Sequence, residues 1–184
     1  MEFRLLYEGP LKANGGIRDK QDIRRALHSQ FSVLWQQPPL DGYPEFLKEE
    51  PKDGETSILN SVGDFTFAPL ICKKLHLVAK VSITFLRPEA PGSLITQGGD
   101  IDNRLKTLFD ALRMPKVLSE IPAGEKPQSD EVPFFCLLED DNLITSVSVE
   151  TDRLLRAAPT DSHVHLVIHV ETKQVIATWD NIGL

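Results

Sequence analysis

Two aspartates, with one residue between them, stand where a glycine-containing loop meets an expected helix. Asp100 and Asp102 follow Gly98-Gly99, and Lys106 and Asp110 come later at four-residue steps along the helix. In an extended backbone, residues at i and i+2 point to the same side, so the two carboxylates can converge on one point. Carboxylates at such short range repel each other unless a cation lies between them. The spacing therefore favours a bound cation.

A second acidic group, Glu139-Asp140-Asp141, stands directly before an expected strand and is a candidate source of a third ligand. A hard divalent cation such as Mg²⁺ takes oxygen ligands and keeps several waters. Two or three aspartates around such an ion suit metal-assisted hydrolysis of a phosphodiester, with Lys106 facing the phosphate. Helix capping by one aspartate, together with a surface ion pair of Lys106, explains the same pattern without a metal. For Asp140-Asp141 alone, a solvated turn is the alternative.

Composition limits the class of protein. The 184 residues are 41% apolar and 26% charged, which favours a single domain with a sizeable core. The sequence has no apolar run of transmembrane length, and its first residues, Met1-Glu2-Phe3-Arg4, do not resemble a signal peptide. Cys72 and Cys136 have no further cysteine or histidine at metal-ligand spacing, so neither a disulfide framework nor a cysteine-based zinc site is expected. We therefore expect a cytoplasmic protein without membrane spans.

The net charge of −7 argues against a nucleic-acid partner, but the charges are unevenly distributed. Residues 71–118 carry eight basic and four acidic groups, whereas residues 119–152 carry one and nine. Two proline-rich, acidic stretches, at about 38–70 and 115–138, are expected to be loop insertions at the surface. The central part of the chain can therefore still bind an anionic partner.

Hydrophobic periodicity predicts an α+β fold. The expected elements are strands near 3–7, 75–85, 143–149 and 164–170, and helices from 19 to before 38 and from 102 to 112. Their β-α-β-α-β-β order predicts a mixed sheet packed by two helices, in one small domain over residues 1–184. Arg18, Arg24, Arg25 and His28 are expected on the polar face of the first helix.

The segment from Asp100 to Leu112 resembles the signature of a known family. That signature is Asp-x-Asp-Asn-x-x-Lys-x-x-x-Asp-Ala-Leu, and it is present here without a gap. The family is the RusA family of Holliday junction resolvases, which are Mg²⁺-dependent endonucleases that act as dimers on four-way DNA junctions. Its acidic pair before the next strand is similar to Asp140-Asp141, and its first loop is similar to the loop from Gly9 to Asn14.

The resemblance implies roles for individual residues. The implied ligands of Mg²⁺, or of Mn²⁺ in its place, are Asp100, Asp102 and Asp141, and Lys106 completes the implied catalytic set. The residues implied to support this set are Asn103, Asp110 and Asp140. The candidates for DNA contact are Lys12, Asn14, Arg18 and Arg104. The resemblance further implies a homodimer that cleaves branched DNA in recombination or repair.

Two other functions fit the same sequence. The acidic charge and the long insertions favour a non-catalytic binding module for protein or nucleic acid. A site of two or three aspartates does not by itself specify DNA, so a metal-dependent hydrolase of another phosphodiester is the second alternative. His163, His165 and His169 alternate along the last expected strand, but without a paired carboxylate nearby they are expected to face solvent.

Overall fold

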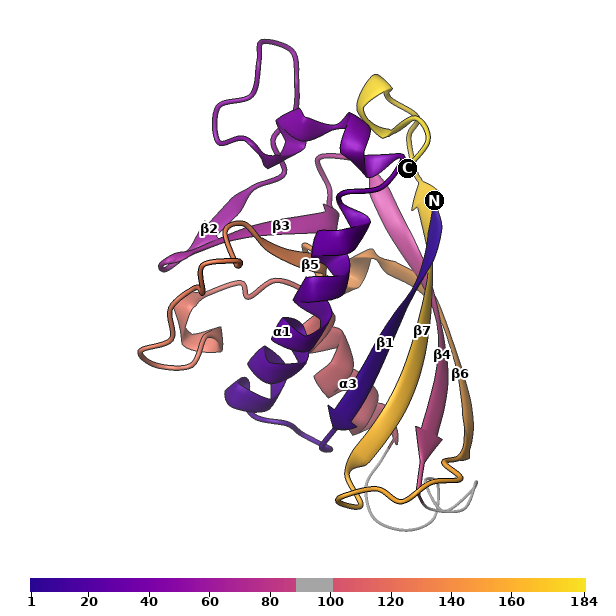
Figure 1. The fold of residues 1–184 in the computed structure, drawn as a ribbon. Coiled ribbons are helices and arrows are strands. Elements are labelled where there is room, and N and C mark those ends of the chain that lie inside the picture. Colours follow the sequence, from indigo (N-terminus) through magenta and orange to yellow (C-terminus); the bar gives the residue numbers. More distant parts are fainter. Residues whose placement is uncertain (89–100) are drawn as a thin grey trace.

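The computed structural model describes residues 1–88 and 101–184 (Figure 1). Its helices and strands are β1 (Glu2–Pro10), α1 (Ile17–Leu34), β2 (Asn60–Val62), β3 (Phe65–Ile71), β4 (Leu77–Arg87), α3 (Ile101–Leu112), β5 (Phe134–Leu138), β6 (Ile144–Arg153) and β7 (His163–Gln174). Short 3-10 helices are η1 (Leu40–Gly42), η2 (Pro44–Leu47), η3 (Leu118–Glu120), η4 (Asp141–Leu143) and η5 (Trp179–Asn181). The expected α+β class is confirmed. None of the helices described here has the length and apolar character needed to cross a membrane.

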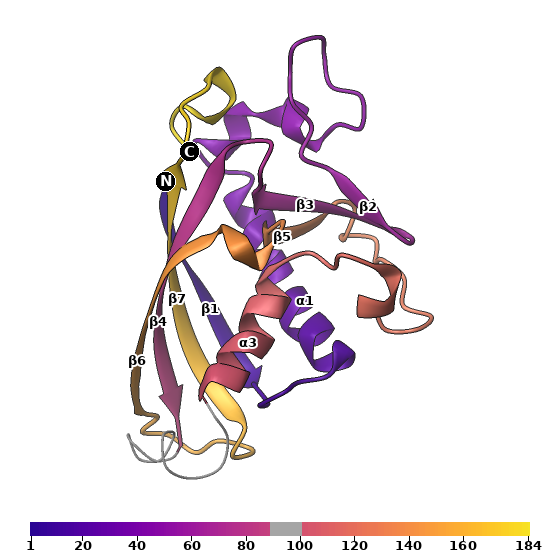
Figure 2. The same cartoon turned by 180° about the vertical axis from the view of Figure 1, so that it is seen from behind.

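The larger sheet has the strand order β1-β7-β4-β6. β7 is antiparallel to both of its neighbours, and β4 and β6 are parallel. Strict alternation along β4 buries Leu77, Ala79, Val81, Ile83 and Phe85. Both ribbon views show α1 and α3 on one side of this sheet (Figures 1 and 2). Alternation therefore gives the sheet a buried face under the helices and a polar face on the other side.

A second, smaller sheet has the order β2-β3-β5, with β3 and β5 parallel. The expectation of a continuous loop over 38–70 is wrong at its C-terminal end, because β3 lies there. The rings of Phe65 and Phe67 have centroids 5.6 Å apart, and those of Phe67 and Phe134 are separated by 5.4 Å. These buried rings form one apolar cluster, so the C-terminal ends of both acidic stretches are packed in the interior.

The first helix is buried on two sides. The expected apolar positions Ile23, Leu27 and Phe31 are buried. Arg24 and His28, which were expected on the polar face, are buried as well. The reason is that residues 113–138 cover this face: Arg24 Nε donates to the Arg113 carbonyl over 3.1 Å, and the Phe135 N–H donates to His28 Nδ1 over 3.0 Å.

The outer edge of β1 is closed by a side chain of α1. The Leu6 N–H donates to Gln30 Oε1 over 2.9 Å, and Gln30 Nε2 donates to the Leu6 carbonyl over 2.6 Å. The amide of Gln30 thus takes the place of a neighbouring strand at this position. At the opposite edge of the sheet lies β6, most of whose residues are exposed.

Both cysteines are buried and unbridged, as expected. Burial raises the pKa of the Cys72 thiol to about 11 and that of Cys136 to about 12. Because the thiolate is the reactive form, neither cysteine is a nucleophile near neutral pH.

Candidate functional sites

The start of α3 presents two residues of the predicted catalytic set to solvent. Asp100 lies outside the described residues. Asp102 is exposed in the first turn, where its Oδ1 accepts a hydrogen bond of 2.9 Å from the Asn103 N–H. Lys106 is exposed one turn later. Since residues four apart are neighbours on a helix surface, a carboxylate and an ammonium group lie side by side here.

The loop after β1 fixes the position of this helix start. The buried guanidinium of Arg104 donates from Nη1 to the Leu11 carbonyl, and the Gly15 N–H donates to Thr107 Oγ1 over 2.9 Å. A Cβ on Gly15 would lie 2.6 Å from the Thr107 methyl group, so only glycine allows this close approach. Arg104 is therefore held in the interior between α3 and this loop, and its contact with DNA stays a prediction.

Asp110, later in the same motif, binds two cations of the protein. Lys20 Nζ lies 2.7 Å from its Oδ2, and Arg113 Nη2 lies 3.3 Å from its Oδ1. The Asp110 side chain is only 14% exposed. These contacts join α1 to α3 and give Asp110 a structural role.

The acidic pair before β6 is engaged with a lysine. Lys116 Nζ lies 2.7 Å from Asp140 Oδ2 and 3.7 Å from Asp141 Oδ1. Burial alone would raise the pKa of Asp140, but hydrogen bonds from Lys116 and the Asn142 N–H, with the charge of Lys116, outweigh it and lower the pKa to about 2. Asp140 is thus ionised in the folded protein, and its carboxylate is paired with Lys116.

The structure places Asp102 and Asp141 at opposite ends of α3. The helix has 12 residues, so at about 1.5 Å per residue its ends lie roughly 17 Å apart. The Met114 N–H donates to the Leu138 carbonyl over 2.8 Å, which holds the end of β5 at the C-terminal end of α3. Both views show the chain between β5 and β6 beside that end (Figures 1 and 2). One Mg²⁺ with ligands at about 2.1 Å does not contact both residues in this arrangement.

The remaining candidates for DNA contact lie near the start of α1. Lys12 Nζ is 2.8 Å from Asp19 Oδ1, and Arg18 Nη1 is 2.5 Å from Glu125 Oε2. Asn14 is exposed and has a φ of 54°. Lys12 and Arg18 are thus exposed cations that already have carboxylate partners.

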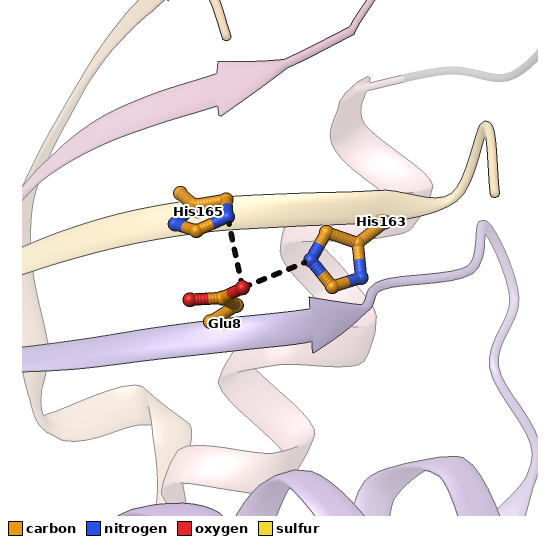
Figure 3. A group of neighbouring side chains, drawn as sticks. All are labelled: Glu8, His163 and His165. Atoms are coloured by element: carbon orange, nitrogen blue, oxygen red, sulfur yellow. Dashed lines mark ion pairs between the residues drawn. The ribbon is translucent and has the colours of Figure 1, made fainter. Parts of the chain in front are cut away.

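A second group of chemically competent side chains lies on the polar face of the larger sheet. Glu8 of β1 stands between two histidines of β7, with its Oε1 3.5 Å from His163 Nε2 and 3.3 Å from His165 Nε2 (Figure 3). Arg156 donates a hydrogen bond to Glu8 and lies 2.7 Å from His165 Nε2. The expectation that no carboxylate completes the histidine set is therefore wrong. The β1–β7 register pairs Glu8 with His165, and this register is the signal that the sequence does not display.

The protonation states of this second group follow from its contacts. Partial burial would raise the pKa of Glu8, but the hydrogen bond and charge of Arg156, with help from the histidines, lower it. Burial lowers the pKa of His165, and the charge of Arg156 lowers it further. Near neutral pH, Glu8 is an anion and His165 a neutral imidazole.

Known proteins were compared with the chain in three ways. A scan against models of protein families, a search of curated proteins and a search of solved structures found no match.

Proposed function

We propose that the chain is a metal-dependent endonuclease that cleaves phosphodiester bonds in branched DNA. The observation that carries this proposal is the motif from Asp100 to Leu112, together with the exposure of Asp102 and Lys106 at the start of α3. Mg²⁺ is commonly bound by one or two carboxylates plus phosphate oxygens and water. Asp100 and Asp102 are therefore a sufficient protein ligand set, and the proposal does not include Asp141.

The chemistry divides between the ion and the protein. When bound, Mg²⁺ or Mn²⁺ would polarise the phosphate and make a water molecule a better nucleophile. Lys106 is placed to bind the same phosphate, because it stands one helical turn from Asp102 and is exposed. An ammonium group at this point would stabilise the negative charge that develops on the phosphate oxygens.

The DNA backbone would reach this site across the neighbouring start of α1. Lys12 and Arg18 lie there, and the contact of Gly15 with Thr107 joins this region to α3. Phosphates would compete with Asp19 and Glu125 for the two cations, so binding should weaken as salt concentration rises. In a two-fold homodimer, two such sites would face two strands of a symmetric junction, as recombination or repair requires.

The test is cleavage of a labelled synthetic four-way junction, with linear duplex alongside, in Mg²⁺ or Mn²⁺ at low salt. The wild type should nick the junction only with metal, and Asp102→Asn and Lys106→Met should abolish nicking without loss of folding. Asp141→Asn is the matched control, because it removes the charge of a carboxylate that lies beside the other end of α3. We expect this control to retain cleavage within about threefold, a change of under 1 kcal/mol in the barrier.

Other outcomes assign other functions. Equal cutting of linear duplex would indicate a less selective phosphodiester hydrolase. Cleavage by Asp102→Asn at the wild-type rate would remove the proposed mechanism. Loss of cleavage in Asp141→Asn would show that Asp141 reaches the ion in a different arrangement of the chain.

A non-catalytic binding module is the second candidate function. The separation of Asp141 from Asp102 favours it, since this separation leaves fewer carboxylates near the start of α3 for a metal ion. A folded protein that binds a four-way junction but cleaves no DNA in either metal would support this module.

A further inference from the structure

We propose that Glu8, His163 and His165 form a binding site for a divalent transition-metal ion, with Zn²⁺ as the best-fitting member of the class. Two imidazoles and one carboxylate are a common ligand set for zinc, with a fourth position left to water. The three ligand atoms all lie within 4.8 Å of one another. This site lies on β1 and β7, on the polar face of the larger sheet (Figure 3).

The strand register brings the three side chains together. Glu8 is directly opposite His165 in the antiparallel pair of β1 and β7, and His163 is opposite Pro10, two residues further along. Directly opposite residues and their diagonal neighbours on one face are within side-chain reach of each other. The ligands therefore come from two rigid strands, and ordering them requires no movement of the backbone.

Two of the three distances between ligand atoms match a tetrahedral metal site. With bonds of about 2.0 to 2.1 Å to a central zinc, two ligand atoms at the tetrahedral angle lie about 3.3 to 3.4 Å apart. The carboxylate oxygen of Glu8 lies 3.3 Å from His165 Nε2 and 3.5 Å from His163 Nε2. Figure 3 shows both imidazoles with a ring nitrogen directed at the carboxylate.

Charge and access also suit a metal ion. A divalent ion would take the place of the Arg156 guanidinium as the positive partner of the Glu8 carboxylate. The Glu8 side chain is 53% exposed, so an ion can enter from solvent. Arg156 contacts Glu8 and His165 where an ion would bind, but its side chain is 57% exposed and can turn away. We therefore expect Arg156 to compete with the metal.

Metal binding at this point would stabilise the loop after β1, which contacts the start of α3. The Leu11 N–H donates to the Ser162 carbonyl over 2.8 Å, directly beyond the paired strands. The next residues of this loop contact Arg104 and Thr107 of α3. An ion that bridges β1 and β7 would restrain this loop, so we assign the site a structural role.

The test measures the affinity of the untagged full-length chain for Zn²⁺, by competition with a chromophoric chelator at pH 7.5. We expect one ion per chain, and at least a tenfold loss of affinity in each of Glu8→Gln, His163→Ala and His165→Ala. His169→Ala is the matched control, because His169 lies on the same strand and face but pairs with Glu2 at 2.7 Å. This control should keep the wild-type affinity.

A further variant tests the competition by Arg156. Arg156→Ala should bind Zn²⁺ more tightly, because it removes the cation without removing a ligand. Substitution with Co²⁺ should give the strong visible absorption of a tetrahedral site in wild type and in His169→Ala, and not in His165→Ala.

Three results would overturn the proposal. One is the absence of Zn²⁺ binding at micromolar concentration in both the wild type and Arg156→Ala. Another is equal affinity in the wild type and in all three ligand variants. The last is an equal loss of affinity in His169→Ala and His165→Ala. Circular dichroism of each variant would establish that it is folded.

Discussion

Lys20 of α1 donates a hydrogen bond from Nζ to Oδ2 of Asp110 in α3, over 2.7 Å. Both side chains are mostly buried, and the Asp110 carboxylate also receives a hydrogen bond from Arg113. Shielding from solvent strengthens such an ion pair, so this contact helps to hold α1 against α3. Asp110 thus contributes to the packing of α3 rather than to the exposed group at its start.

We predict that Asp110→Asn lowers the free energy of unfolding by about 1 to 2 kcal/mol, between the values for surface and buried ion pairs. Urea denaturation followed by circular dichroism would measure this change. Lys106→Met is the control, since it should lose cleavage but keep stability within about 0.5 kcal/mol. Unchanged stability in Asp110→Asn together with lost cleavage would instead place Asp110 in the chemistry.

Arg24 secures the C-terminal end of α3 from the neighbouring helix. It donates to the carbonyls of Asp110 and Arg113 and to the Gln21 side chain. Burial lowers the pKa of Arg24 to about 10, so the group still carries its charge at neutral pH. These are carbonyls that a helix end leaves without partners, and a cation is favourable beside them.

We predict that Arg24→Lys destabilises the fold by about 2 to 4 kcal/mol, because lysine cannot reproduce three planar donors in a buried position. Arg4→Lys is the matched control, with a side chain that is 59% exposed. Its unfolding midpoint in urea should stay at the wild-type value. Equal midpoints for both variants would contradict the role of the Arg24 guanidinium.

The pair of Asp140 with Lys116 predicts a pH-dependent contribution to stability. The pKa of Asp140 is lowered from 3.8 to about 2 in the folded protein, so the ionised form is favoured by folding. This contribution is complete above the unfolded pKa and is lost as pH falls from about 4 toward 2.

Asp140→Asn should therefore be less stable than the wild type at pH 6, and the difference should shrink as pH decreases through this range. Lys116→Met should behave in the same way, because it removes the partner. The measurement is urea unfolding at pH 6, 4 and 3. A difference that stays constant with pH would rule out this assignment.

The sequence predicts those features that depend on local periodicity. The alternation of β4 and the apolar stripes of α1 and α3 are visible in the sequence because each is repeated every few residues. The position of Asp102 and Lys106 at the start of a helix follows from the same pattern. The second sheet was not predicted, since β3 pairs in parallel with β5, which lies far along the chain, and β3 has no alternation of its own.

The contacts at the candidate sites that the sequence does not reveal have the same origin. The location of Asp141 depends on the path of residues 113–138, which is set by contacts with Arg24 and Arg113 that no spacing reveals. Glu8 meets His165 only through the β1–β7 register, between strands at the two ends of the chain. Arg104 has the spacing of a motif residue, yet the Leu11 carbonyl holds it in the interior.

The amide of Gln30 also sets a limit on assembly. Because Gln30 occupies the free backbone groups of Leu6, the larger sheet cannot be extended past β1 at that point. Among the described strands, β6 is the other edge of this sheet. If two chains joined through β6, both remaining edges of the joined sheet would be β1 edges. The Gln30 amide would then interrupt further strand pairing at Leu6 on each of these edges.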